Sequence, residues 1–217
     1  MTQPFQTGSV SGPLLLADIS GYTSFFQIVA ETHKDDAFFS GGRVPDAYGL
    51  VSSLLDGIVE RIVPPLTFSK LEGDAVFAFA TDDADVPRGA AVLDWLTDCY
   101  TSFRDRLAGA GDIWSCQCDV CSRSGGVDLK GLDLKFVLHA GNYVVQSIAG
   151  SRELVGPEVV MAHRLLKNHA AELVGPAYAL VTDAAAERLA IPLGAARQLT
   201  EAYEHYPPID VRVYALR

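Results

Sequence analysis

The sequence lacks any apolar run long enough to span a bilayer, which takes about 20 residues in a helix. Residues 1–12 also lack the basic region and apolar core of a secretory signal. Basic residues are few: 17 Lys and Arg stand against 27 Asp and Glu, the formal net charge is −10, and no Lys/Arg cluster occurs. A nucleic-acid binder needs basic surface to displace counterions. We therefore expect a cytoplasmic protein that binds neither membranes nor nucleic acid.

The chain is long enough for one substantial core, with 217 residues of which 49% are hydrophobic. Expected strands and helices alternate along it, and no internal repeat is present. We predict a single α/β (α+β) domain over residues 1–217, with a mostly antiparallel sheet flanked by helices and an insert at about 109–131. The expected strands cover 14–19, 66–71, 75–80, 132–139, 143–149, 178–181 and 210–216, and the expected helices cover 23–32, 46–63, 86–107, 158–170 and 183–189.

The segment Leu14–Phe26 carries the most specific local pattern. An apolar run ends at Asp18, and Ser20-Gly21 leads directly into an amphipathic stretch. This pattern predicts a strand, a sharp turn and a helix N-terminus, with one carboxylate at the junction. Such a carboxylate can bind a divalent metal, and the free N–H groups of the first helical turn can face a phosphate.

A second carboxylate, Asp74, follows Gly73 in a predicted hairpin turn. If the strands that carry Asp18 and Asp74 are neighbours, both carboxylates project from the same edge of the sheet. Two adjacent carboxylates repel each other unless a cation lies between them, so the pair predicts a site for Mg²⁺ or Mn²⁺. Taken singly, each aspartate is more typical of a turn than of a metal site.

Several short blocks resemble the motifs of class III nucleotide cyclases and occur in the order of that family. The resemblance extends over most of residues 14–170 and implies a ferredoxin-like sheet core. The blocks are Asp18–Thr23 and Lys70–Asp74, similar to the two metal motifs; His139–Gly141, similar to a His-x-Gly strand end; and Glu153–Gly156 with Ala162–Arg164, similar to the ribose-binding helix.

The resemblance implies a role for each matching residue. The metal ligands would be Asp18, Asp74 and the carbonyl of Ile19, and Gly21, Tyr22 and Thr23 would adjoin the nucleotide. Lys70 and Glu153 fall on base-contacting positions, and the lysine favours adenine over guanine. Arg164 falls on the arginine that stabilises charge in the transition state. The family also implies a head-to-tail homodimer, in which the aspartates of one subunit face Lys70, Glu153 and Arg164 of the other.

The sequence departs from the family pattern in three respects. Val160 stands where an asparagine orients the ribose, and because residues four apart share a helix face it would lie beside Arg164. Pro157 and Glu158 replace the usual Asp/Asn-Thr pair. The segment Gln198–Leu216 contains no lysine for the triphosphate. Loss of a positioning group can cost about 10²-fold in rate, so we expect weak cyclisation or none.

A cysteine cluster, Cys116-x-Cys118-x-x-Cys121, lies in the predicted insert. In a cytosolic chain this spacing suits a tetrahedral zinc site that would stabilise the insert. The fourth ligand is left open among Cys99, Asp119 and a histidine such as His33. The alternative is an exposed loop with reduced thiols.

Three hypotheses follow. The first is a degenerate cyclase-like module that binds divalent metal and a purine nucleotide and has a regulatory or signalling role. The second is an active adenylyl cyclase that makes cyclic AMP from ATP by a two-metal mechanism. The third is a structural homodimer with a zinc-stapled insert.

Overall fold

The chain forms one large mixed sheet with helices on both faces, seen in a computed structural model that describes residues 8–34, 44–111, 113–114, 121 and 125–217. The strands are β1 Gly8–Ser20, β2 Thr67–Glu72, β3 Ala75–Phe79, β4 Ile113–Trp114, β5 Val127–Asp128, β6 Asp133–Ile148, β7 Ser151–Val155, β8 Tyr178–Thr182, β9 Arg197–Glu201 and β10 Ile209–Ala215. The helices are α1 Tyr22–Thr32, α2 Ala47–Ile62, α3 Ala90–Ala110, α5 Pro157–Arg164, α6 Ala170–Val174 and α7 Asp183–Arg188.

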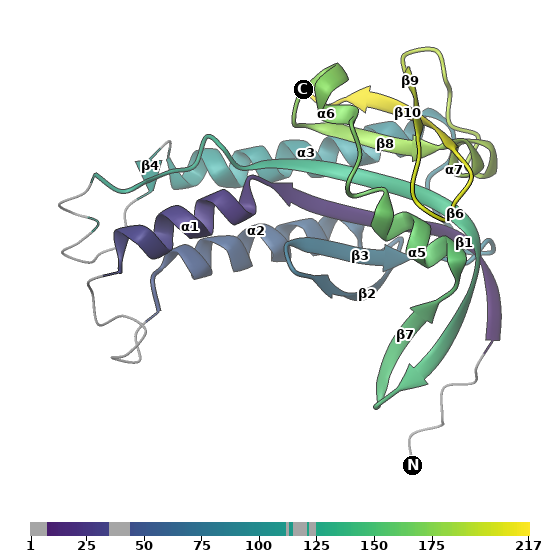
Figure 1. The fold of residues 1–217 in the computed structure, drawn as a ribbon, viewed down its shortest axis with the longest axis horizontal. Helices are drawn as coiled ribbons and strands as arrows, with labels where there is room; N and C mark the ends of the chain where they lie inside the picture. Colours follow the sequence, from purple (N-terminus) through teal and green to yellow (C-terminus); the bar gives the residue numbers. More distant parts are fainter. Residues whose placement is uncertain (1–7, 35–43, 112, 115–120, 122–124) are drawn as a thin grey trace.

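The strand order of the large sheet is β2-β3-β1-β6-β8-β10-β9, with β7 paired to β6 outside this order. Strand β6 runs parallel to β8, and the other strand pairs described in this sheet are antiparallel. The β6–β7 hairpin extends away from the rest of the sheet, as Figure 1 shows. The predicted fold class, a mainly antiparallel sheet flanked by helices, is therefore confirmed.

The central strand β1 is buried on both faces because its apolar residues alternate between two cores. Leu15 and Ala17 pack with α2 and α3 on one face, whereas Leu14 and Leu16 pack with α5 on the other. In Figure 1, α5 lies in front of the sheet and α2 and α3 lie behind it. No helix in the described ranges is long and apolar enough to cross a membrane.

One sequence expectation was wrong at the centre of the sheet. The separate strands 132–139 and 143–149 are a single strand, β6, of 16 residues. Gly141 lies in the expected gap between those two strands, but the structure places it opposite Gly12 of β1 in an unbroken ladder. A Cβ at Gly141 would lie 2.5 Å from the Cγ of Glu158, so the glycine permits close packing of α5 on the strand.

The C-terminal half also differs from expectation in its detail. The expected helix 158–170 divides into α5 and α6, and the side chain of Asn168, in the segment between them, accepts from the N–H of Ala170. Strands β7 and β9 were not predicted. Both are five-residue strands made mostly of polar residues, so neither produces an apolar run.

Candidate metal and nucleotide site

A pocket forms where β1 passes directly into α1. The turn requires Gly21, which has a φ of +80° and whose added Cβ would lie 2.0 Å from the carbonyl oxygen of Gly131. Phe25 N–H donates to the carbonyl of Gly21, which begins the helix. The first-turn N–H groups of α1 therefore lie beside the end of β1, as the sequence predicted.

The two expected carboxylates lie on neighbouring strands. Residues Asp18 of β1 and Ala75 of β3 are opposite each other in the antiparallel pair, and Ile19 N–H donates to the carbonyl of Asp74 at 3.3 Å. Asp18 and Asp74 line the same open pocket, together with Ile19, Gly21, Tyr22 and Thr23. The structure thus brings together six of the eight residues that the resemblance assigned to metal and nucleotide, and Lys70 and Glu153 do not line this pocket.

Lys135 also lies in this pocket, and the sequence did not identify it. It is the β6 residue directly opposite Asp18, and its Nζ lies 2.9 Å from Asp18 Oδ2 and 3.4 Å from the carbonyl of Leu166. A lysine within the otherwise apolar segment Leu134–Leu138 was the available signal. The ion pair means that Asp18 already has a cationic partner.

The charges in the pocket influence one another. Burial raises the pKa of Asp74, repulsion by Asp18 raises it further, and Lys135 acts in the opposite direction. Burial lowers the pKa of Lys135, but its hydrogen bond and attraction to Asp18 outweigh that effect and hold the pKa above its usual value. The pocket therefore favours a second cation close to Asp74.

The donor set suits a hard divalent cation. The pocket has a volume of about 380 Å³ and presents two carboxylates as metal ligands. Within the described ranges no group of three or more His, Cys, Asp or Glu side chains is arranged to hold a metal. Mg²⁺ is commonly bound by one or two carboxylates together with water and phosphate oxygens. The residues thus fit Mg²⁺ or Mn²⁺ with a phosphate ligand, provided that Asp18 is released from Lys135.

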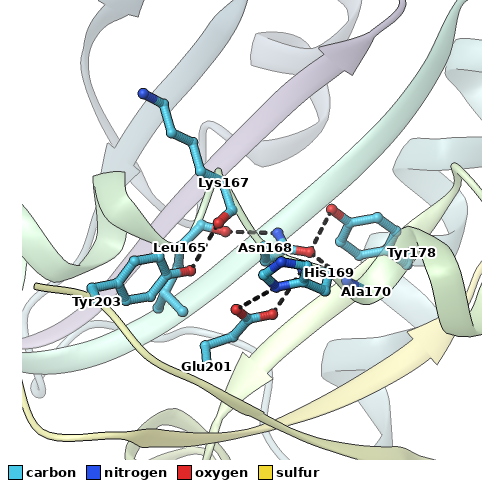
Figure 2. A network of polar contacts seen from close by, with 8 residues as sticks. All are labelled: Leu165, Lys167, Asn168, His169, Ala170, Tyr178, Glu201 and Tyr203. Carbon is cyan, nitrogen blue, oxygen red and sulfur yellow. Dashed lines mark hydrogen bonds and ion pairs between the residues drawn. The ribbon is translucent and has the colours of Figure 1, made fainter.

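Lys167 also lines the pocket, and a polar network fixes its backbone. The hydroxyl of Tyr203 donates to the carbonyl of Lys167 at 3.2 Å, and Asn168 binds the carbonyl of Leu165 and the hydroxyl of Tyr178. In Figure 2 the Lys167 side chain extends away from this network. The segment is therefore held in place while the ammonium of Lys167 stays outside the network.

The same network contains the buried carboxylate of Glu201. It accepts from the backbone N–H of His169 at 2.8 Å, and its other oxygen lies 3.0 Å from His169 Nδ1 (Figure 2). This contact joins β9 to the start of α6. No role for His169 could be predicted from the sequence, because its partner Glu201 lies 32 positions away on β9, a strand that was not predicted.

The expected base-contacting residues also lie together. Lys70 Nζ is 2.8 Å from Glu153 Oε2 and 3.0 Å from Glu72 Oε1. The hydrogen bonds to Glu153 and Glu72 raise the pKa of Lys70 above its usual value. The pair forms within one chain, where β2 lies near β7.

Arg164 and Val160 line a second pocket of about 380 Å³, together with His163, Lys167 and Tyr203. The guanidinium carbon of Arg164 lies 5.5 Å from the ring centroid of Tyr206, within cation–π range. Val160 is 44% exposed, so its isopropyl group faces the pocket without a packing role in the core. Lys167 lines both pockets, which therefore adjoin each other.

The predicted cysteine cluster is only partly described. Cys116 and Cys118 lie outside the described residues, whereas Cys121 is described and buried. Cys121 does not belong to either pocket.

The fold is that of the catalytic domains of class III nucleotide cyclases. Three solved structures share it: the adenylyl cyclase CyaB from P. aeruginosa (16% identity, TM-score 0.64, 98% of each chain), the guanylyl cyclase Cya2 (12%, 0.61, 99% of this chain and 96% of that one) and a bacterial light-regulated adenylyl cyclase (14%, 0.63, 95% and 51%). At these identities the likeness establishes the fold alone.

The chain belongs to the family described as "Protein of unknown function (DUF2652)", which matches residues 51–173. A relative in Mycobacterium tuberculosis, "Uncharacterized protein Rv2561/Rv2562", is 30% identical over 142 residues. That alignment covers 64% of this chain and 60% of the relative, so the chain spans less than two thirds of the relative's length.

Proposed function

We propose that the chain is a nucleotide-cyclase-like domain that binds a divalent cation and the phosphates of a purine nucleotide, with weak cyclisation or none and a regulatory role. The observation that carries this proposal is the pocket at the β1–α1 junction. It combines two carboxylates for the cation with Lys135, Lys167 and the α1 N-terminus for phosphate. Mg²⁺ or Mn²⁺ held by Asp18 and Asp74 would supply positive charge to the phosphate oxygens.

The Lys70–Glu153 pair supports a purine. Lys70 and Glu153 are already hydrogen-bonded to each other, so one donor and one acceptor are held side by side. Such a pair can meet the ring nitrogen and the amino group of adenine. Against efficient turnover, Val160 offers no hydrogen bond to a ribose at the position beside Arg164.

A homodimer forms part of the proposal. Leu71 of β2, Ile148 of β6 and Val160 of α5 are 44–48% exposed on the elements that carry or flank the Lys70–Glu153 pair. A second copy that covers these side chains would place its own aspartate pocket opposite the pair. Light scattering after gel filtration should give the mass of two chains, and a monomer at micromolar concentration would contradict this part.

Titration calorimetry with Mn²⁺ and a non-hydrolysable ATP analogue tests the binding proposal. We expect binding by the wild type, at least about tenfold weaker binding by Asp74→Asn, and unchanged binding by Asp56→Asn, an exposed aspartate on α2. Absence of any binding by the wild type would refute the proposal.

Incubation with Mn²⁺ and ATP then measures cyclic AMP, and rapid formation that is lost in Asp18→Ala would instead establish an active adenylyl cyclase.

A further inference from the structure

The side chain of Lys167 lies at the boundary between the carboxylate pocket at the β1–α1 junction and the second pocket, because it lines both. Lys167 is exposed and follows the end of α5 by three positions. Of the described residues in the two linings, it is the one that they share. A ligand that extends from one pocket into the other therefore passes this side chain.

The cations of the two pockets differ in what they already contact. The ammonium of Lys135 lies 2.9 Å from Asp18 Oδ2, and the guanidinium of Arg164 lies over the ring of Tyr206. Within the described ranges the ammonium of Lys167 has no hydrogen-bond or ion-pair partner. Lys167 can thus bind an anionic ligand without first breaking an internal contact, whereas Lys135 cannot.

The backbone that carries Lys167 is held by the C-terminal part of the chain. The hydroxyl of Tyr203 donates to the carbonyl of Lys167 at 3.2 Å, and the N–H of His169 donates to the buried carboxylate of Glu201 at 2.8 Å. Figure 2 shows the Lys167 side chain extended away from these contacts. A fixed backbone reduces the freedom that is lost when the side chain binds a ligand, so the contacts favour binding.

This arrangement offers a substitute for a group that the sequence lacks. The segment Gln198–Leu216 contains no lysine for a triphosphate, but it contains Tyr203, and Glu201 lies in it as well. Both residues hold the segment that follows α5. The C-terminal strands therefore contribute to the pocket by positioning a lysine from another element.

We propose that Lys167 binds the outer phosphates of a nucleotide and thereby makes the site selective for nucleoside polyphosphates over monophosphates, with Tyr203 as its positioning residue. The proposal rests on the proposed metal and phosphate site and adds which phosphate chain that site selects. A single phosphate at a cation held by Asp18 and Asp74 stays within the carboxylate pocket. A chain of two or three phosphates that continues toward the second pocket meets the ammonium of Lys167.

Titration calorimetry of the full chain in Mn²⁺ tests the selectivity, with a non-hydrolysable ATP analogue and AMP as the two probes. A charge-assisted contact to phosphate predicts that Lys167→Met weakens binding of the analogue by at least about tenfold, and binding of AMP by less than about twofold. Lys167→Arg keeps the charge and should retain most of the affinity for the analogue. Lys130→Met, at an exposed position before β6, is the control and should bind both probes as the wild type does.

Tyr203→Phe tests the positioning role, because it keeps the ring and removes only the hydroxyl that donates to Lys167. Loss of one neutral hydrogen bond predicts about threefold weaker binding of the analogue. If Tyr203 acts through Lys167, adding Tyr203→Phe to Lys167→Met should cause no further loss. A further loss of the same size in the double variant would overturn the positioning role.

The outcomes separate this proposal from the proposed function. A wild type that binds neither probe would refute both. A wild type that binds the analogue, together with Lys167→Met that binds it equally well, would overturn the role of Lys167 and leave the metal and nucleotide site intact. Equal weakening of the analogue and AMP by Lys167→Met would also overturn the proposal, because it would show no selection between phosphate chains.

Discussion

The ammonium of Lys135 and the carboxylate of Asp18 form an ion pair of 2.9 Å across the β1–β6 ladder. The residue expected to bind the metal is therefore already neutralised by a side chain of the same domain. A divalent cation must compete with a tethered amine for one of its two carboxylates.

Replacement of Lys135 by methionine should consequently tighten Mn²⁺ binding by at least about tenfold. Two unit charges about 4 Å apart interact by about 1 kcal/mol at the dielectric constant of water and by about 4 kcal/mol at a dielectric constant of about 20, and a divalent cation doubles both figures. Calorimetry with the metal alone measures the effect, and Lys130→Met, at an exposed position before β6, is the control. Equal affinities in wild type and Lys135→Met would show that the ion pair does not compete with metal.

Gly21→Ala should destabilise the protein by at least about 2 kcal/mol. A residue with a side chain is strained at the φ of +80°, and its Cβ would lie 2.0 Å from the backbone oxygen of Gly131. Urea unfolding gives the change in free energy. The partner glycine is the control, because a Cβ at Gly131 would meet no atom within 4 Å and Gly131→Ala should cost less than about 0.5 kcal/mol.

Val160→Asn should increase cyclic AMP formation, by up to about 10²-fold, if the missing ribose contact limits turnover. The position is 44% exposed, so the fold should tolerate an amide there. Val160→Ala removes the isopropyl group without adding a donor and should not show the gain. An unchanged rate in Val160→Asn, with nucleotide binding retained, would locate the defect elsewhere.

The stability of the protein should depend on the protonation of His139. Burial lowers the pKa of this side chain below its usual 6.5, against an opposing contribution from Glu158. The folded state therefore keeps the ring of His139 neutral. The stability that this residue contributes is fully present above pH 6.5. As the pH falls below 6.5, the unfolded chain binds the proton first, so stability decreases by up to about 1.4 kcal/mol per pH unit.

Urea unfolding between pH 7.5 and 5 measures this dependence in the wild type and in His139→Gln. The glutamine retains one donor and one acceptor for Thr182 and Glu158, the two partners of the ring. The difference in free energy of unfolding between the wild type and His139→Gln should shrink as the pH falls. A constant difference across this range would exclude titration of His139 as its cause.

Local sequence patterns predicted the β1–α1 junction and the hairpin that carries Asp74, because each depends on neighbours within about ten positions. The proximity of Asp18 and Asp74 then needed only the assumption that their strands pair. Lys135 could not be placed in this way, since it meets Asp18 only through the register of a 13-residue ladder formed by segments over 100 positions apart.

Glycine was the main source of error in the sheet. Gly141 beside Asn142 is typical of a turn, yet the chain continues straight through both residues. Glycine is required at position 141 because the side chain of Glu158, on the helix that follows the strand, occupies the space of a Cβ. No local sequence pattern contains that information. The buried contact of 3.2 Å between His33 Nε2 and Cys121 Sγ has the same origin, because the sequence offered several candidate ligands and tertiary structure brings one of them to the sulfur.

Helix α1 begins at the carboxylate pocket and is followed directly by His33, so its 11 residues form a rod of about 16 Å between the pocket and the buried contact of His33 with Cys121. A ligand that orders the first turn would therefore restrain the same rigid body that packs against Cys121 at its other end. By thermodynamic linkage, a change at Cys121 that weakens this packing would in turn weaken binding in the pocket.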